Sequence, residues 1–163
     1  MTPSVPTIFF LHGLDSSSKG FKATWFANNF PQMHIHSYSG TLAERLATLE
    51  EHSSSHKELI LVGSSYGGLM ATCFAQRHPE QCLRLILLAP ALNFAGFIPP
   101  SVQLATPTTL IIGKNDTVCP PQDVLPLAQK TFSQLTIQLA EDDHMLHRFF
   151  PLLDWQDLLG SNT

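Results

Sequence analysis

The sequence predicts an α/β fold, a three-layer α/β/α sandwich whose middle layer is a six-stranded parallel sheet. The first observation is that short apolar runs alternate with segments of helical spacing six times along the chain. The second is that one apolar run leads through a glycine-containing turn directly into a helical segment. With 163 residues, 44% of them hydrophobic, the chain can bury one sizeable core. We therefore expect a single domain over residues 1–163.

Six short runs are predicted as strands, because continuous or alternating apolar residues suit a buried sheet. They are Thr7–Leu11, Met33–Tyr38, Leu59–Val62, Leu83–Ala89, Thr108–Ile112 and Leu135–Leu139. Ligands bind such parallel sheets at the carboxyl ends of the strands. The loops that follow these runs are therefore where we look for functional residues.

The segments between the runs show the spacing of helices that cover the sheet. The first is Phe21–Phe30, which Pro31 ends, and the second runs from the capping box Thr41-Leu42-Ala43-Glu44 to Leu49. The third ends at Pro79, and the fourth is capped by Asp123 and has Pro126 in its first turn. The fifth is Phe149–Leu159, which ends at Gly160. Residues 92–105 are irregular and short, so we expect no helical lid domain.

The stretch Leu59–Thr72 contains the most informative motif. After the apolar run, Gly63-Ser64-Ser65-Tyr66-Gly67 matches G-x-S-x-G, and apolar residues then recur with helical spacing. A strand, a sharp turn and a helix form the context of a nucleophile elbow, which places Ser65 at its apex. Glycines at both ends of the motif leave room for neighbouring backbone in such a turn. The alternative interpretation is a glycine-rich turn with an idle serine.

His144 is the predicted catalytic base. A nucleophilic serine needs a histidine to accept its proton, and in this fold pattern that histidine follows the serine in the sequence. His144 lies in the loop after the last predicted strand, whereas His78 ends the elbow helix at the opposite edge of the sheet. His147, three residues beyond His144, is the second candidate.

Asp116 is the predicted acid that orients the histidine. It follows the fifth predicted strand closely, at the carboxyl end. Glu141, Asp142 and Asp143 adjoin His144 in the sequence, and such a neighbour rarely points at the edge of the ring. Asp123 is expected to cap a helix. The alternative interpretation of Asp116 is that of a turn residue without a catalytic role.

Two backbone N–H groups are expected to stabilise negative charge on the substrate oxygen. One is that of Tyr66, because the first N–H groups of a helix have no partner within the helix. The second should come from the loop after the first strand, with Leu14 N–H as the first candidate and Asp15 N–H as the next. The imidazole of His12, in the same loop, is expected to shape the loop by hydrogen bonding.

Charge and composition exclude several functions. The net charge is −4 with only 9 Lys and Arg and no basic run, which excludes a nucleic-acid partner. No apolar stretch is long enough to span a bilayer or to act as a secretory signal. The 3 cysteines match no zinc spacing and suit a cytoplasmic protein. His34 and His36 share a strand face, but no further ligand is indicated, so we expect no metal and no cofactor.

Three groups of motifs together resemble a known family. They are HGLDSS at 12–17, GSSYGG at 63–68, and GKND at 113–116 with DDH at 142–144. They resemble the small, lidless bacterial α/β-hydrolases of the YqiA/YcfP esterase type, in which an H-G-x-x-S-S loop, a G-S-S-x-G-G elbow, an N-P-A-like segment, a G-x-x-D turn and a final D-H occur in this order. The N-P-A-like segment is Ala89-Pro90-Ala91 here.

The resemblance extends from Thr7 to Gly160. It implies a minimal α/β-hydrolase fold and esterase activity on short acyl esters, with Ser65, Asp116 and His144 as the catalytic triad. One departure is Asp142, which stands where that type often has glycine and adds a second carboxylate beside His144.

The predicted absence of a lid implies a shallow, open substrate pocket. Tyr66 occupies the variable position of the elbow and is expected to narrow the acyl pocket. Phe94, Phe97 and Ile98 are candidates for one wall of that pocket, and the alternative is that they simply cover the sheet.

The predicted activity is that of a carboxylic-ester hydrolase that forms an acyl-enzyme on Ser65, with a small acyl ester or thioester as substrate. A thioesterase or a small-peptide hydrolase would use the same groups. The alternative class is a catalytically silent binding protein on a hydrolase fold. A dinucleotide-binding module is excluded, because no G-x-G-x-x-G follows a strand. The sequence suits either a monomer or a small homo-oligomer.

Overall fold

Six parallel strands form one sheet in the order β2-β1-β3-β4-β5-β6. The computed structural model describes residues 2–160. The strands are β1 (Thr7–Leu11), β2 (His34–Ile35), β3 (Leu59–Ser64), β4 (Cys82–Leu88), β5 (Thr108–Gly113) and β6 (Leu135–Ala140). The predicted six-stranded parallel sheet is thus confirmed.

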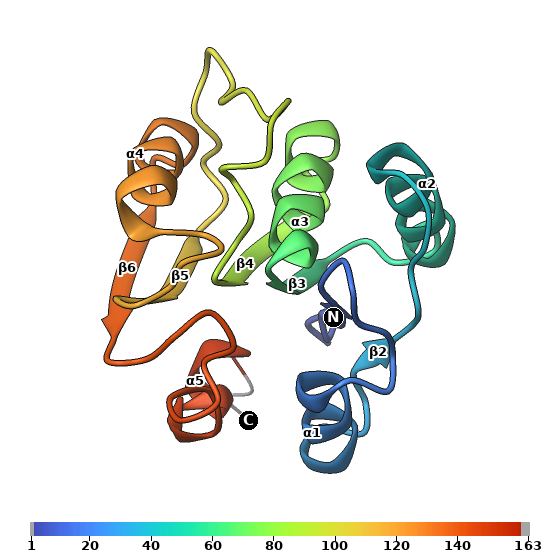
Figure 1. Ribbon diagram of the computed structural model, residues 1–163. Coiled ribbons are helices and arrows are strands. Elements are labelled where there is room, and N and C mark those ends of the chain that lie inside the picture. Colours follow the sequence, from blue (N-terminus) through green and yellow to red (C-terminus); the bar gives the residue numbers. More distant parts are fainter. Residues whose placement is uncertain (1, 161–163) are drawn as a thin grey trace.

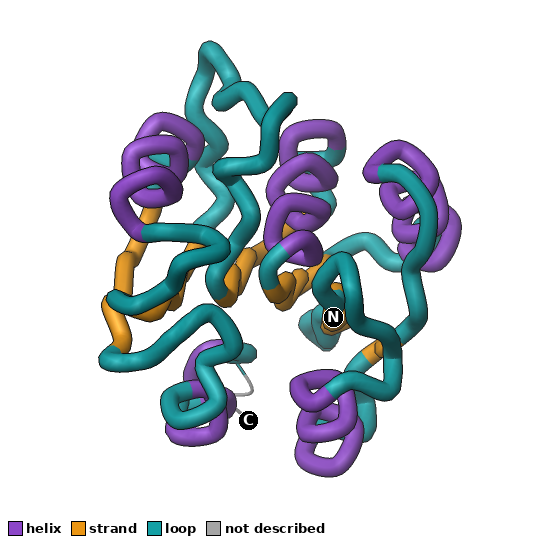
Figure 2. The backbone as a smooth tube through the Cα atoms, viewed as in Figure 1, coloured by secondary structure: helices purple, strands orange, loops and turns teal. Residues whose placement is uncertain are grey.

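Helices cover both faces of this sheet (Figure 1). They are α1 (Phe21–Asn29), α2 (Leu42–Ser53), α3 (Tyr66–Arg77), α4 (Pro121–Thr131) and α5 (Trp155–Leu158), with a short 3₁₀ helix at Phe150–Leu152. Helices α2, α3 and α4 lie on one face, and α1 and α5 lie on the other. Figure 2 shows the sheet as a single layer between these two layers of helices, which is the predicted three-layer sandwich.

Strand β3 lies in the interior because its side chains are apolar on both faces. All six of its residues are buried. Leu59 and Leu61 point into the core beneath α2, α3 and α4, whereas Ile60 and Val62 point into the core beneath α1 and α5. This alternation explains why the run is continuously apolar, since each face of a parallel sheet is covered by helices. The turn that carries Ser65 therefore follows a strand that is buried over its whole length.

Strand β2 is shorter than the predicted run Met33–Tyr38. The chain leaves the sheet after Ile35 because its next polar groups bond to the loop that follows β1. The N–H of Tyr38 donates to His12 Nε2 at 2.8 Å, and the hydroxyl of Ser37 bonds to the hydroxyl of Ser18 at 2.8 Å. Residues 36–38 therefore support a loop beside the site instead of extending the sheet.

Two helix predictions are wrong in detail. Asp123 does not cap α4, because the helix already begins at Pro121, where the missing N–H of proline costs no helical hydrogen bond. As a result Pro126 lies inside the helix. The predicted helix Phe149–Leu159 is broken in two, because Leu153 is extended and the side chain of Asp154 caps a new start by accepting from the N–H of Asp157.

The connection between β4 and β5 contains no helix over residues 89–107, all of which the structure describes. It runs as an irregular excursion away from the sheet (Figure 1). The site at the carboxyl ends of the strands is therefore not covered by a helical lid from this connection.

Candidate active site

Ser65 occupies a sharp turn between β3 and α3. Its φ and ψ are 55° and −115°, a conformation that is rare for residues other than glycine. The main chain on either side is fixed by neighbouring backbone: Ser65 N–H donates to Leu88 O at 2.9 Å, and Ser65 O accepts from Ala91 N–H at 2.9 Å. These contacts with the end of β4 hold the strained residue in place.

The glycines of the elbow are required by close backbone contacts. A Cβ on Gly67 would collide with the carbonyl of Leu11, and one on Gly63 would collide with the carbonyl of Gly67. A Cβ on Gly68 would lie 2.7 Å from Pro90 Cβ. Helix α3 therefore packs against the ends of β1 and β4 at a distance that no larger residue allows, as expected for a nucleophile elbow.

A continuous hydrogen-bond chain joins Asp116, His144 and Ser65. His144 Nε2 lies 3.0 Å from Ser65 Oγ, and His144 Nδ1 lies 2.7 Å from Asp116 Oδ2. A carboxylate can only accept here, so Nδ1 carries the proton and Nε2 is free to accept the hydroxyl proton of Ser65. The structure thus brings together the three residues that the sequence analysis singled out.

The carboxylate of Asp116 is fully buried, and its second oxygen is also satisfied. Asp116 Oδ1 accepts from the N–H groups of Val118 at 2.9 Å and Cys119 at 2.7 Å, while the side chain has no exposed surface. Hydrogen bonds to both oxygens fix the orientation of this carboxylate. Asp116 is therefore held to present one oxygen to His144.

The other candidates for the base and the acid near His144 make structural contacts instead. The ring of His147 packs edge-on against Phe21 with 5.0 Å between centroids. Asp142 Oδ2 accepts from the N–H groups of Arg148 and Phe149 at 3.0 and 2.9 Å, so it closes the loop that carries His144. The Asp142 carboxylate therefore stabilises this loop.

The loop after β1 is shaped by His12, as the sequence analysis expected. Its Nδ1 donates to Gly13 O at 2.7 Å and its Nε2 accepts from Tyr38 N–H at 2.8 Å. Burial lowers the pKa of His12, which favours the neutral ring that this pattern requires. The loop lies directly over Ser65, because a Cβ on Gly13 would be 3.6 Å from Ser65 Cβ.

Arg45 supports this region and was missed in the sequence analysis. Its guanidinium donates to Leu14 O at 3.2 Å and to Gly40 O at 3.1 Å, and its Cζ lies 5.1 Å from the centre of the Tyr66 ring. The buried Arg45 therefore contacts both residues whose N–H groups are candidates for charge stabilisation. Arg45 lies on an amphipathic helix of ordinary pattern, so the sequence did not mark it as part of the site.

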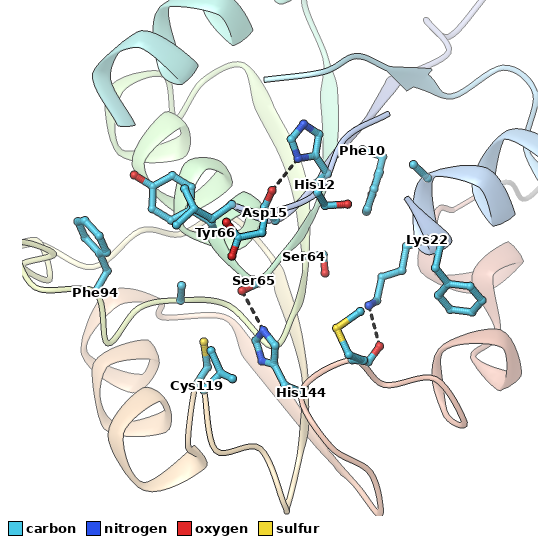
Figure 3. Close-up of a pocket in the computed structure, with 18 of the residues that line it drawn as sticks. Phe10, His12, Asp15, Lys22, Ser64, Ser65, Tyr66, Phe94, Cys119 and His144 are labelled. Carbon is cyan, nitrogen blue, oxygen red and sulfur yellow. Dashed lines mark hydrogen bonds between the residues drawn. The ribbon is translucent and has the colours of Figure 1, made fainter. Parts of the chain in front are cut away.

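A cavity of about 540 Å³ opens at the Ser65–His144 pair (Figure 3). Tyr66 and Phe94 line it on one side, and Lys22 lies on the opposite side of the pair in this view. The rings of Tyr66 and Phe94 meet edge to face with 5.5 Å between centroids. The cavity therefore extends in two directions from the serine.

Two of the expected pocket residues do not line this cavity. Phe97 packs against the core beneath α2, α3 and α4, and the side chain of Ile98 is 79% exposed. Of this irregular segment, only the beginning, up to Phe94, lines the cavity. For Phe97 the alternative interpretation, that of a residue covering the core, agrees with the structure.

Cys119 and Lys22 line the cavity although no motif marked them. Burial raises the pKa of the Cys119 thiol to about 11, so this neighbour of Ser65 stays a neutral thiol and does not compete as a nucleophile. Burial lowers the pKa of Lys22 to about 8. Long-range contacts bring both residues to the site, which is why their spacing in the sequence carries no signal.

Four histidines gather at the β2 edge, away from the serine. The rings of His36 and His52 stack with 4.0 Å between centroids, and those of His34 and His56 lie 5.2 Å apart. Burial and the neighbouring imidazoles lower the pKa of His34 and His36. Within residues 2–160, no group of three or more His, Cys, Asp or Glu side chains is arranged to hold a metal ion.

The fold has close structural relatives. Over all of this chain and 93% of the other, it is similar to alpha/beta hydrolase domain-containing protein 10 from mouse, with a TM-score of 0.78 and 20% identity. A hydrolase of the alpha/beta superfamily from Xanthomonas campestris pv. campestris has a TM-score of 0.78 and 23% identity, over 98% of this chain and 99% of that one. These likenesses establish the fold.

Sequence comparison gives the family. The chain is 33% identical to phytyl ester synthase 1, chloroplastic, of Arabidopsis thaliana over 100 residues. The aligned region covers 55% of this chain and 14% of that protein. The chain thus spans a small part of this relative. None of the helices in residues 2–160 has the length and apolarity to cross a membrane. The family model described as alpha/beta hydrolase fold matches residues 13–103, more than half of the chain, which therefore belongs to the alpha/beta hydrolase fold family.

Proposed function

We propose that this protein is a serine hydrolase that cleaves carboxylic esters with short acyl chains through an acyl-enzyme on Ser65. The observation that carries the proposal is the hydrogen-bond chain from Asp116 through His144 to Ser65, which ends at the cavity. The resemblance to the YqiA/YcfP esterase type supports the same activity, and a relative named as an ester synthase supports chemistry at an acyl ester.

In the first half of the reaction Ser65 Oγ attacks the ester carbonyl carbon while His144 Nε2 takes the hydroxyl proton. The carbonyl oxygen becomes an oxyanion, which the N–H groups of Leu14 and Tyr66 stabilise. His144 then returns the proton to the alcohol oxygen as the C–O bond breaks, and the alcohol leaves. Asp116 remains ionised throughout and stabilises the imidazolium by accepting from Nδ1.

In the second half of the reaction, a water molecule enters where the alcohol left. His144 takes a proton from the water, the hydroxide oxygen attacks the acyl carbon, and the proton goes back to Ser65 Oγ as the acid is released. No step requires a metal or a cofactor.

Labelling with a fluorophosphonate, followed by mapping of the modified peptide, tests the proposal. We expect modification at Ser65 in the wild-type protein and none in His144→Ala, because the serine is activated only through the histidine. Absence of labelling in well-folded wild-type protein would favour a silent binding protein. Relative kcat/KM values for an oxygen ester, a thioester and an amide with the same acyl group then distinguish esterase, thioesterase and peptidase.

A further inference from the structure

Lys22 is a buried cation in the wall of the cavity. It is the second residue of α1 and only 7% of its surface is exposed. Its side chain lines the same cavity as Ser65 and His144, and Figure 3 shows it opposite Phe94 across this pair. A lysine so far from solvent is unusual, since burying an ammonium group is costly unless other groups compensate.

The compensation within the protein is incomplete. Lys22 Nζ donates to Met145 O at 2.7 Å and lies 5.7 Å from the centre of the Phe150 ring. An ammonium group has three N–H donors, and no carboxylate in residues 2–160 forms an ion pair with this one. Asp142 and Asp143 act on it only through longer-range attraction. Donors of a buried positive charge thus remain available to a ligand.

The rest of the cavity offers an anion no partner comparable to Lys22. No other Lys or Arg lines it among the described residues, and Phe10, Phe21 and Ala23 add apolar surface to the lining. Asp15, the acidic residue of the rim, is exposed, so water screens its charge. An anionic group that enters this side of the cavity therefore meets a single desolvated cation, where a charge-assisted hydrogen bond is strong.

We infer, on the basis of the proposed esterase function, that Lys22 forms an anion subsite and that the preferred substrates are esters carrying a carboxylate. The carboxylate binds the Lys22 ammonium at one end of the cavity, the ester carbonyl lies at Ser65, and the uncharged part of the substrate lies against Tyr66 and Phe94. The alternative is that Lys22 only positions the loop of His144 through Met145 O.

Kinetics with matched esters distinguish these roles. The substrates are phenyl butyrate, which is neutral, monophenyl succinate, with a carboxylate on the acyl part, and 3-butanoyloxybenzoate, with a carboxylate on the alcohol part. We expect one of the two charged esters to have the highest kcat/KM. In Lys22→Met the ratio of charged over neutral kcat/KM should fall roughly 10- to 100-fold, the effect of one charge-assisted hydrogen bond.

Two further variants sharpen the result. Lys22→Arg keeps the charge and should retain most of the ratio, while Lys19→Met removes an exposed charge nearby and should leave it unchanged. In the wild type the ratio should decline above about pH 8, where the ammonium loses its proton. An equal loss on all three esters in Lys22→Met, with the ratio preserved, would overturn the subsite and leave a positioning role.

A binding measurement separates this inference from the proposed function. Calorimetry with succinate and benzoate on the Ser65→Ala protein, with and without Lys22→Met, requires no turnover. Binding that is lost with Lys22→Met supports the subsite even if no ester is hydrolysed, in which case the esterase proposal alone fails. If neither anion binds and neither charged ester is preferred, the subsite is refuted while ester hydrolysis can stand.

Discussion

Replacing Asp116 by Asn changes one atom in the hydrogen-bond chain and tests the proposed mechanism most directly. The carbonyl oxygen of Asn can still accept from the N–H groups of Val118 and Cys119, so the turn is preserved. Its NH₂ group then faces His144 Nδ1, where a carboxylate oxygen accepts at 2.7 Å in the wild type. A donor at this place forces the proton of the neutral imidazole onto Nε2.

The expected effect on activity is large, whereas the effect on stability is small. With a proton on Nε2, the ring cannot accept the proton of Ser65 Oγ 3.0 Å away. Loss of the correct tautomer lowers kcat by about 10⁴-fold, which corresponds to about 5.4 kcal/mol in the barrier. The two retained backbone hydrogen bonds limit the loss of folding free energy to about 1–2 kcal/mol.

The assay is kcat for phenyl butyrate hydrolysis, accompanied by a denaturation curve for each protein. Asp123→Asn is the matched control, because this carboxylate is exposed in the first turn of α4 and should leave kcat unchanged. If Asp116→Asn keeps kcat within tenfold of the wild type while remaining folded, His144 is not oriented by Asp116 and the proposed acid is wrong.

Three further predictions concern stability. Gly67→Ala should lower the free energy of unfolding by more than about 3 kcal/mol or prevent folding, because its Cβ would collide with the carbonyl of Leu11 and neither backbone can move freely. Urea denaturation measures this loss. Thr41→Ala should cost about 1 kcal/mol in the same assay, because it removes half of the capping box of α2. Stability should fall as the pH drops below 6.5, because burial lowers the pKa of His12, His34 and His36, and neighbouring imidazoles add to the shift of the last two. The unfolded chain therefore binds protons first. His34→Gln should reduce the slope of stability against pH, with His12 and His36 contributing the remainder.

Matched variants provide the controls. In Gly20→Ala the new Cβ meets chiefly the end of the flexible Ser16 side chain, so the loss should be about 1 kcal/mol at most. Thr48→Ala lies within α2 outside the capping box and should leave stability nearly unchanged. His147→Gln leaves the β2 histidines intact, so a slope reduced equally by this variant would contradict the assignment to His34 and His36.

The sheet and the arrangement of the candidate site could be predicted because their signals are local. The apolar run of β3 reflects burial on both faces, and the glycines at 63 and 67 mark a turn that no other residue fits. Asp116 and His144 follow from the rule that functional residues come after parallel strands, since chain order alone brings them to one edge of the sheet. Each of these inferences needed only neighbours in the sequence.

What could not be predicted depends on contacts between distant segments. The ammonium of Lys22 bonds to Met145, 123 positions away, and a helix pattern cannot reveal that this face turns toward a cavity. The length of β2 was misjudged because Tyr38 bonds to His12, 26 positions earlier. That Phe97 and Ile98 do not line the cavity likewise follows from the path of an irregular segment. Sequence periodicity does not predict the path of such a segment.

The main-chain contacts that fix Ser65 have a consequence for how this protein can change. Its position is set by backbone hydrogen bonds with Leu88 and Ala91, whereas the side chains of Phe94 and Lys22, which line the cavity, make none of these bonds. Substitutions of these side chains can thus reshape the cavity while the main chain keeps Ser65 in place. A directed-evolution experiment can therefore vary cavity side chains such as Phe94 without removing the main-chain bonds that hold the proposed nucleophile.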